Sequence, residues 1–81
     1  MNSKIFSLGL SDRAITLYLL IDCMVSSGIA PTGKNCRRDW TGTNDEYLAS
    51  YVELSKAGVV TVVDEQFSII ASSEWKRLFS E

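Results

Sequence analysis

The chain has 81 residues, of which 46% are apolar and 22% are charged. This length allows one small domain, residues 1–81, and the apolar share excludes a disordered chain. The net charge of −2 and the isoelectric point near 5.0 are unusual for a nucleic-acid binder, which usually carries a basic excess. A local basic patch can nevertheless suffice for contact with phosphates.

The main apolar run, residues 14–25, contains Thr16 and Asp22 and is shorter than the about 20 residues that a membrane helix needs. The start of the chain is too polar for a secretory signal. We therefore expect a cytoplasmic protein without a membrane partner. Cys23 and Cys36 lack the spacing of a metal site, and we expect both to be reduced and buried.

The first predicted helix begins after Ser11, a good N-cap, and is apolar around most of its circumference, which is typical of a central helix. Gly28 is the predicted stop, and Pro31 prevents continuation. Residues 5–10 are predicted to form an arm or short helix on the core. Residues 29–30 are predicted to form a short strand.

Two further helices are predicted, and a tight turn separates them. The first covers residues 34–40 and is broken by Thr41-Gly42. Thr43 and Glu46 then form a capping box, which opens a helix that ends at Gly58.

Residues 59–63 and 67–71 are rich in β-branched side chains and predict a hairpin with the polar loop 64–66. A last helix is predicted over residues 73–81, which leaves a domain core of residues 10–71. Trp75, Leu78 and Phe79 share one face of that helix. They either cover the core or form an exposed strip that makes a homodimer, and we favour the dimer.

This order of elements resembles the winged helix-turn-helix domains of phage and plasmid replication initiators and of small transcription regulators. The matching residues are Leu10-Ser11, Tyr18-Leu19-Leu20, Cys36 to Trp40, Thr43 to Ala57 and Ala57-Gly58-Val59-Val60. The resemblance implies an α/β (α+β) fold with three core helices, a hairpin wing and a C-terminal helix. The chain departs from the family's pattern at Arg37 and Thr41, where the family usually has a small residue and a glycine.

The resemblance also implies a function. The chain would be a DNA-binding module of a phage or mobile element, acting in replication initiation or transcriptional regulation in the cytoplasm of a bacterial host. Double-stranded DNA would be its partner, and the second helix of the pair would enter the major groove. The predicted nucleic-acid-binding residues are Lys34, Arg37, Arg38, Asn44, Ser50 and Lys56.

The acidic residues favour a second hypothesis, a protein–protein interaction module on the same frame. Two of the positions that would face the bases, Asp45 and Glu46, are carboxylates, and duplex DNA repels them. The module would be an inhibitor or adaptor that docks on a basic protein partner. Its predicted partner-binding residues are Asp45, Glu53, Asp64 and Glu65.

Catalysis is not expected. The chain contains no histidine and no glycine-rich phosphate loop, so neither a His-based triad nor a His-type zinc site can form. We predict no enzyme activity and no cofactor. Tyr47 and Tyr51 lie one turn apart, and either one packs in the core with the other on its rim, or they stack on bases or contact a partner.

Overall fold

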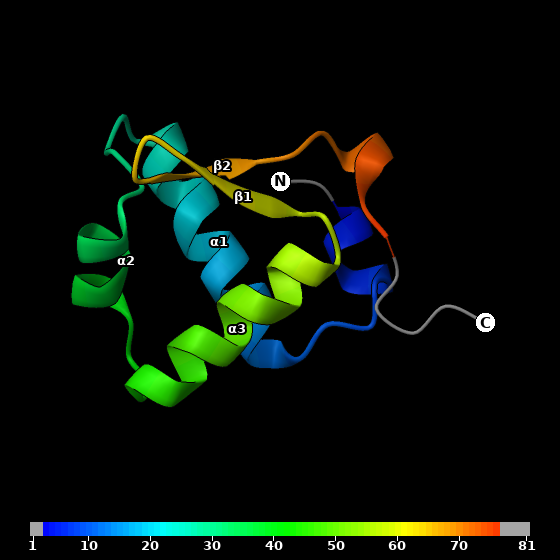
Figure 1. The fold of residues 1–81 in the computed structure, drawn as a ribbon, viewed down its shortest axis with the longest axis horizontal. Helices are drawn as coiled ribbons and strands as arrows, with labels where there is room; N and C mark the ends of the chain where they lie inside the picture. Colours follow the sequence, from blue (N-terminus) through cyan, green and yellow to red (C-terminus); the bar gives the residue numbers. More distant parts are fainter. Residues whose placement is uncertain (1–2, 77–81) are drawn as a thin grey trace.

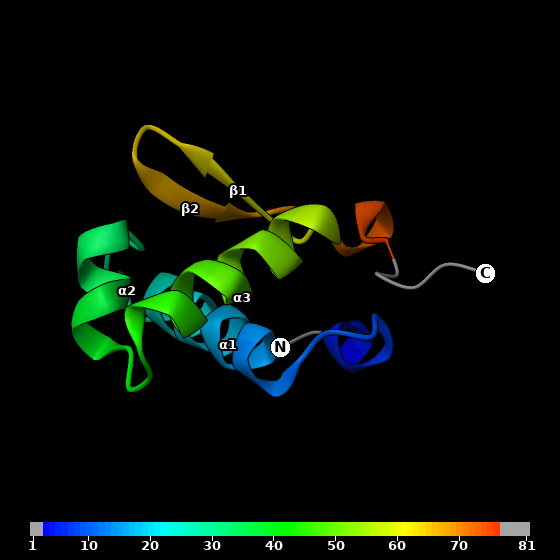
Figure 2. The same cartoon turned by 60° about the horizontal axis from the view of Figure 1, so that its bottom comes forward.

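The computed structural model of the chain describes residues 3–76, in which three α-helices precede a two-stranded antiparallel hairpin. In Figures 1 and 2, α3 crosses in front of α1, and α2 lies at the same end as the hairpin turn. The elements are the 3-10 helix η1 (Ser3–Ser7), α1 (Asp12–Ser26), α2 (Gly33–Asp39), α3 (Asn44–Lys56), β1 (Val60–Val63), β2 (Gln66–Ile69) and the 3-10 helix η2 (Ser72–Glu74).

The central helix α1 begins and ends with satisfied backbone groups. The Ser11 hydroxyl accepts a hydrogen bond from the Ala14 N–H at 3.3 Å, as expected of an N-cap. Gly28 adopts a φ of 75°, and the Ile29 N–H donates to the Met24 carbonyl at 2.8 Å. This Schellman ending requires a residue that tolerates positive φ. The buried side of α1 carries Ala14, Leu17, Tyr18, Ile21 and Met24.

Helix α3 packs across α1 and ends in the same way. Gly58 has a φ of 70°, and the Val59 N–H donates to the Leu54 carbonyl at 2.9 Å. The position is also crowded, because a Cβ on Gly58 would lie 3.3 Å from the backbone oxygen of Glu74. The helix therefore turns directly into β1 at a residue where glycine is required.

The hairpin pairs β1 with β2 from Val60 opposite Ile69 to Val63 opposite Gln66. Its turn contains two residues, Asp64 and Glu65, one fewer than the predicted loop. Both have positive φ, 50° and 65°, which is the backbone of a type I′ turn. The turn therefore uses carboxylate residues where asparagine and glycine are preferred.

The predicted strand at residues 29–30 is absent from the described chain. The contact with β2 is made instead by the two residues that follow, Pro31 and Thr32. A single bridge joins Thr32 to Gln66, and the Phe67 N–H donates to the Pro31 carbonyl at 2.8 Å. Pro31 has no N–H to donate, so it cannot continue a regular ladder. The segment after α1 thus touches the edge of the hairpin at one point.

The core includes residues outside the predicted range of 10–71. Ile5 and Leu8 are buried, and the Lys4 ammonium donates to the Ser72 carbonyl at 2.7 Å, so η1 and η2 lie side by side (Figure 1). The Trp75 indole N–H donates to the Ile70 carbonyl at 2.7 Å. The Trp75 ring meets the Tyr18 ring edge-on, with 5.6 Å between centroids.

The predicted C-terminal helix does not appear in the described residues. Its first residues form only the short η2, and Trp75 has an extended backbone. Trp75 is 7% exposed and belongs to the core, so its assignment to an exposed dimer strip is wrong. The contact with Tyr18 and the hydrogen bond to Ile70 hold the Trp75 ring in the core. Leu78 and Phe79 lie outside the described residues.

The two cysteines occupy different environments. Cys36 is fully buried, with its sulfur 3.9 Å from that of Met24, and burial followed by the nearby Asp39 charge raises the pKa of its thiol to about 11. Cys23 is exposed, contrary to expectation. Helical spacing explains the difference, because Cys23 lies on the side of α1 opposite the buried Ile21.

Candidate interaction site

The start of α3 is fixed by the predicted capping box. The Glu46 N–H donates to the Thr43 hydroxyl at 3.2 Å, and the Thr43 N–H donates to the Glu46 carboxylate at 2.9 Å. The hydrogen bonds from Thr43 hold the pKa of Glu46 below its usual value, with a smaller contribution from Arg13, whose guanidinium lies 3.8 Å away. The Trp40 indole donates to the Thr43 carbonyl at 3.0 Å. Glu46 is therefore a structural residue of the helix start.

The outer face of α3 is acidic at its beginning, apolar in its middle and basic at its end. Leu48 and Val52 lie one turn apart, and each is 45% exposed. Between residues 44 and 55 the sequence of the helix contains no lysine or arginine. We call this surface the outer face of α3, and its exposed residues are Asn44, Asp45, Leu48, Ala49, Val52, Ser55 and Lys56.

Two residues that the sequence assigned to binding are engaged inside the molecule. Ser50 is fully buried, and its hydroxyl donates to the Glu46 carbonyl at 2.7 Å, so it does not lie on the surface predicted to contact DNA. Its place between Tyr47 and Leu54 on the buried side of α3 explains this. Glu53 accepts from the Ser11 N–H at 2.9 Å and from its hydroxyl at 2.6 Å. Both Glu53 oxygens thus bind α1, so a partner role for Glu53 is not supported.

The basic cluster is carried by α2. Lys34, Arg37 and Arg38 are all exposed. The Arg37 guanidinium lies 5.2 Å from the centre of the Tyr47 ring, a cation–π geometry, and Arg38 lies 3.3 Å from the Asp39 carboxylate. The structure brings the three cations together on one short helix, as predicted. Lys76 lies beside the end of α3, where its N–H donates to the Ala57 carbonyl at 2.7 Å.

The aromatic residues near α2 and α3 pack mainly on one another. Tyr47 is 4% exposed, and its ring meets that of Trp40 edge-on at 5.9 Å. Desolvation raises the pKa of Tyr47. Tyr51 is partly buried on the rim of the core, 5.7 Å from the ring of Phe67. The structural alternative for the two tyrosines, one in the core and one on its rim, is therefore confirmed.

The hairpin tip is exposed and acidic. Asp64 and Glu65 point from the turn, and the adjoining Val62 and Val63 are 47% and 55% exposed. A wing that contacts phosphates needs lysine or arginine at this position, because the duplex carries about one negative charge per 1.7 Å. The tip therefore lacks the cations that contact with phosphates would need.

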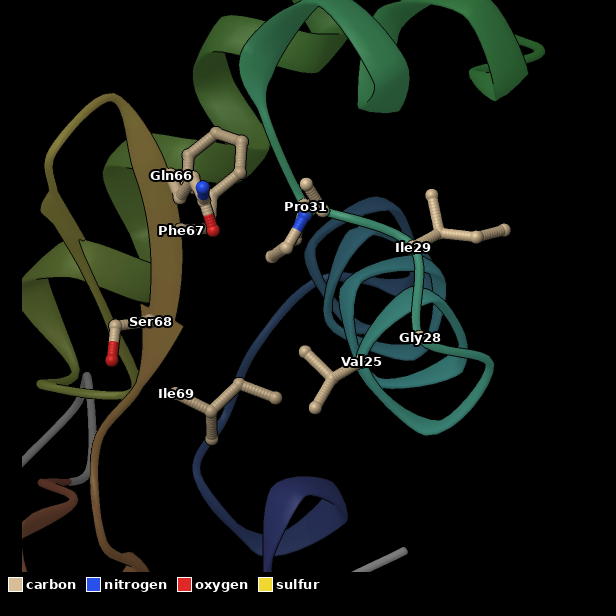
Figure 3. A pocket seen from close by; sticks show the side chains of 9 residues that line it. Val25, Gly28, Ile29, Pro31, Gln66, Phe67, Ser68 and Ile69 are labelled. Atoms are coloured by element: carbon tan, nitrogen blue, oxygen red, sulfur yellow. The ribbon is translucent and has the colours of Figure 1, made fainter.

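A groove lies between the end of α1 and the outer edge of β2 (Figure 3). Val25 from α1 and Ile69 from β2 line it on opposite sides, with Pro31 and Phe67 at one end. Its volume is about 530 Å³, and no charged residue lines it. Sequence reasoning missed this groove, because it arises where the segment after α1 diverges from β2. The signal available in the sequence was Ile29, an apolar residue directly after the predicted helix stop at Gly28.

Within residues 3–76, no group of three or more potential metal-binding side chains is assembled. No helix in the same stretch is long and apolar enough to cross a membrane. The described residues thus offer surfaces for contact, in the form of the outer face of α3, the α2 cations, the hairpin tip and the groove.

Comparison of the chain with protein-family models, with curated proteins and with solved structures found no match.

Proposed function

We propose that the chain is a winged helix-turn-helix module that binds another protein through the outer face of α3. One observation carries this proposal: the face exposes Leu48 and Val52 beside Asp45, in a helix without a cation before Lys56. A protein surface can bury aliphatic side chains and pair a carboxylate with a basic group at its edge.

The arrangement of elements supports the winged-helix part of the proposal. Helices α2 and α3 are joined by residues 40–43, and the hairpin follows α3 directly. The bridge between Thr32 and Gln66 stands where a third strand would join the hairpin. In such a frame α3 is the recognition helix and the hairpin is the wing.

The charges of both recognition elements favour a protein partner. A recognition helix in the major groove reads bases mainly through Arg, Lys, Asn and Gln, whereas Asp or Glu can accept only from cytosine. The outer face of α3 offers Asn44 alone from the preferred group before its last turn. Asp64 and Glu65 add two carboxylates at the wing tip. A module of this kind suits an inhibitor or adaptor.

Capture of partners with immobilised protein tests the proposal. Leu48→Glu places a charge in the centre of the face, and Phe6→Glu does the same at a residue of η1 that is 56% exposed. We expect a partner from a lysate of the producing cells to be lost with Leu48→Glu and retained with Phe6→Glu. The partner is then identified by mass spectrometry, purified and titrated. Retention of every captured protein by both variants would contradict the proposal.

A second candidate function is DNA binding, which the exposed cluster of Lys34, Arg37 and Arg38 favours. Here the module would belong to a phage or mobile element and act in replication initiation or transcriptional regulation, with α2 holding phosphates. Fluorescence anisotropy with a labelled duplex at about 50 and 200 mM salt separates the two functions. Salt-sensitive binding that weakens in Arg37→Ala and Arg38→Ala, with the salt slope reduced by about one in each, would support DNA binding.

A further inference from the structure

Resting on the proposed function, we infer that the outer face of α3 pairs with the same face of a second copy of this chain, with the two helices antiparallel. The partner is then another copy, related by a two-fold axis that passes near the middle of the helix. The inference is carried by the order of charged and apolar residues along this face, which is self-complementary in one direction only.

The charges at the two ends of the face are opposite. Asp45 and Lys56 are both exposed and lie three helical turns apart, about 16 Å along the axis. At about 100° per residue they project within roughly 20° of each other, and Val52 projects in nearly the same direction. Asp45, Val52 and Lys56 therefore form one line along the helix.

Antiparallel pairing brings unlike charges together. It places Asp45 of each copy beside Lys56 of the other, and it sets Leu48 of one copy near Val52 of the other. It also makes the two helix dipoles antiparallel, which is the favourable arrangement. Parallel pairing would instead place Asp45 against Asp45 and Lys56 against Lys56. A two-fold interface requires such self-complementarity, because each contact occurs twice.

Small residues allow close approach of the two helices. Ala49 and Ser55 flank the apolar pair and are exposed. Helix axes can approach to about 8 Å when small side chains lie at the contact. Leu48 and Val52 at the centre of the face are each 45% exposed, so the face is accessible to a second helix.

The size of the face predicts a weak dimer. Specific interfaces bury about 800 Å² per partner, and one face of a 13-residue helix covers less than this. We therefore expect a dissociation constant between about 100 μM and about 1 mM, so that a sizeable share of the protein is dimeric at about 1 mM. Such an association is concentration-dependent and is readily shifted by one charge.

Sedimentation equilibrium of charge-reversed variants tests the inference. Asp45→Lys leaves lysines at both ends of the face, and Lys56→Asp leaves aspartates at both ends. Each variant alone is expected to stay monomeric at concentrations where the parent dimerises, because like charges then meet. An equimolar mixture of the two is expected to dimerise, since every contact is again between unlike charges. Circular dichroism of each variant verifies its fold.

A parent that is monomeric at about 1 mM would overturn the inference, as would single variants that dimerise as well as the parent. Leu48→Gln is expected to weaken dimerisation at least about tenfold, whereas Phe6→Gln, a change at another exposed apolar residue, leaves it unchanged. A monomeric parent that still loses a different captured protein with Leu48→Glu would refute self-pairing and leave the proposed function standing. A monomeric parent, together with retention of every captured protein by Leu48→Glu, would refute both.

Discussion

At the scale of single residues, Glu53 illustrates how a charged side chain that looks available in the sequence is engaged in the fold. Its two oxygens accept from the backbone N–H and the hydroxyl of Ser11, which is 42 positions away and caps α1. The pair therefore ties the start of α1 to the last turn of α3. Charge-assisted hydrogen bonds in a partly buried place contribute more than neutral surface bonds.

Replacement of Glu53 by alanine is expected to lower the free energy of unfolding by about 1–3 kcal/mol, because two donors of Ser11 lose their acceptor. Urea denaturation followed by circular dichroism measures this. In a double-mutant cycle, Ser11→Ala and Glu53→Ala should be non-additive by at least about 0.5 kcal/mol. Additive losses would show that the two side chains act independently.

Ser50 is a polar residue whose burial the sequence did not reveal. A serine on a helix reads as a surface residue, yet this one lies among buried apolar side chains and donates to its own helix at the Glu46 carbonyl. A hydroxyl that is satisfied within the helix costs little to bury. Nothing in the local pattern distinguishes this case from an exposed serine, so the DNA-binding assignment of Ser50 came from position alone.

At the scale of elements, the helix ends were predictable because capping chemistry is local. Ser11, Thr43, Gly28 and Gly58 act as the sequence indicates. The backbone of residues 29–30, and that of residues 73–76 at the described start of the predicted C-terminal helix, were not predictable in the same way. The conformation of these two segments depends on contacts with β2 and with Tyr18, which are distant in the sequence. Local propensity yields to such tertiary contacts in short segments.

The turn between β1 and β2 carries conformational strain that can be relieved. Asp64 and Glu65 occupy positive φ, where asparagine and glycine are preferred. The double change Asp64→Asn and Glu65→Gly is expected to raise the free energy of unfolding by about 1 kcal/mol. Chemical denaturation of the parent and the variant measures the gain.

The matched control for this change is Asp64→Ala with Glu65→Ala. It removes the same two charges without supplying residues that tolerate positive φ. We expect it to lower stability or leave it unchanged. If the alanine pair stabilises as much as the asparagine–glycine pair, charge repulsion is the cause and the strain explanation is wrong.

At the scale of the whole molecule, the ends of the described chain close the core. Ile5 and Leu8 near one end of the described chain and Trp75 near the other are all buried in it. The Lys76 N–H donates to the Ala57 carbonyl at 2.7 Å, which fastens this segment beside the end of α3. A domain of this length has a small core, so each large buried side chain supplies a sizeable share of its stability.

Trp75→Ala is accordingly expected to lower the free energy of unfolding by about 3–5 kcal/mol, enough to unfold much of a marginally stable domain. Trp75→Phe keeps a ring against Tyr18 but leaves the Ile70 carbonyl without the indole donor, and about 1 kcal/mol is the expected loss. Thermal and urea denaturation measure both. Unchanged stability of the alanine variant would contradict the placement of Trp75 in the core.

Some residues of the candidate site could be predicted from the sequence, but which face of α3 is exposed could be seen only in the folded chain. The sequence identified the α2 cations and the acidic start of α3. It could not show that Glu53 turns toward Ser11 while Leu48 and Val52 remain exposed. That distinction depends on the rotation of α3 against α1, which fixes the side of the helix that the core covers.

The contrast between the two cysteines makes the protein suitable for site-selective labelling without mutagenesis. Cys23 is exposed on α1, whereas Cys36 is enclosed and its thiol pKa of about 11 leaves little thiolate near neutral pH. A maleimide dye or spin label should therefore attach at Cys23 while the fold remains intact. One labelled position on each copy would then report distances between copies directly in solution.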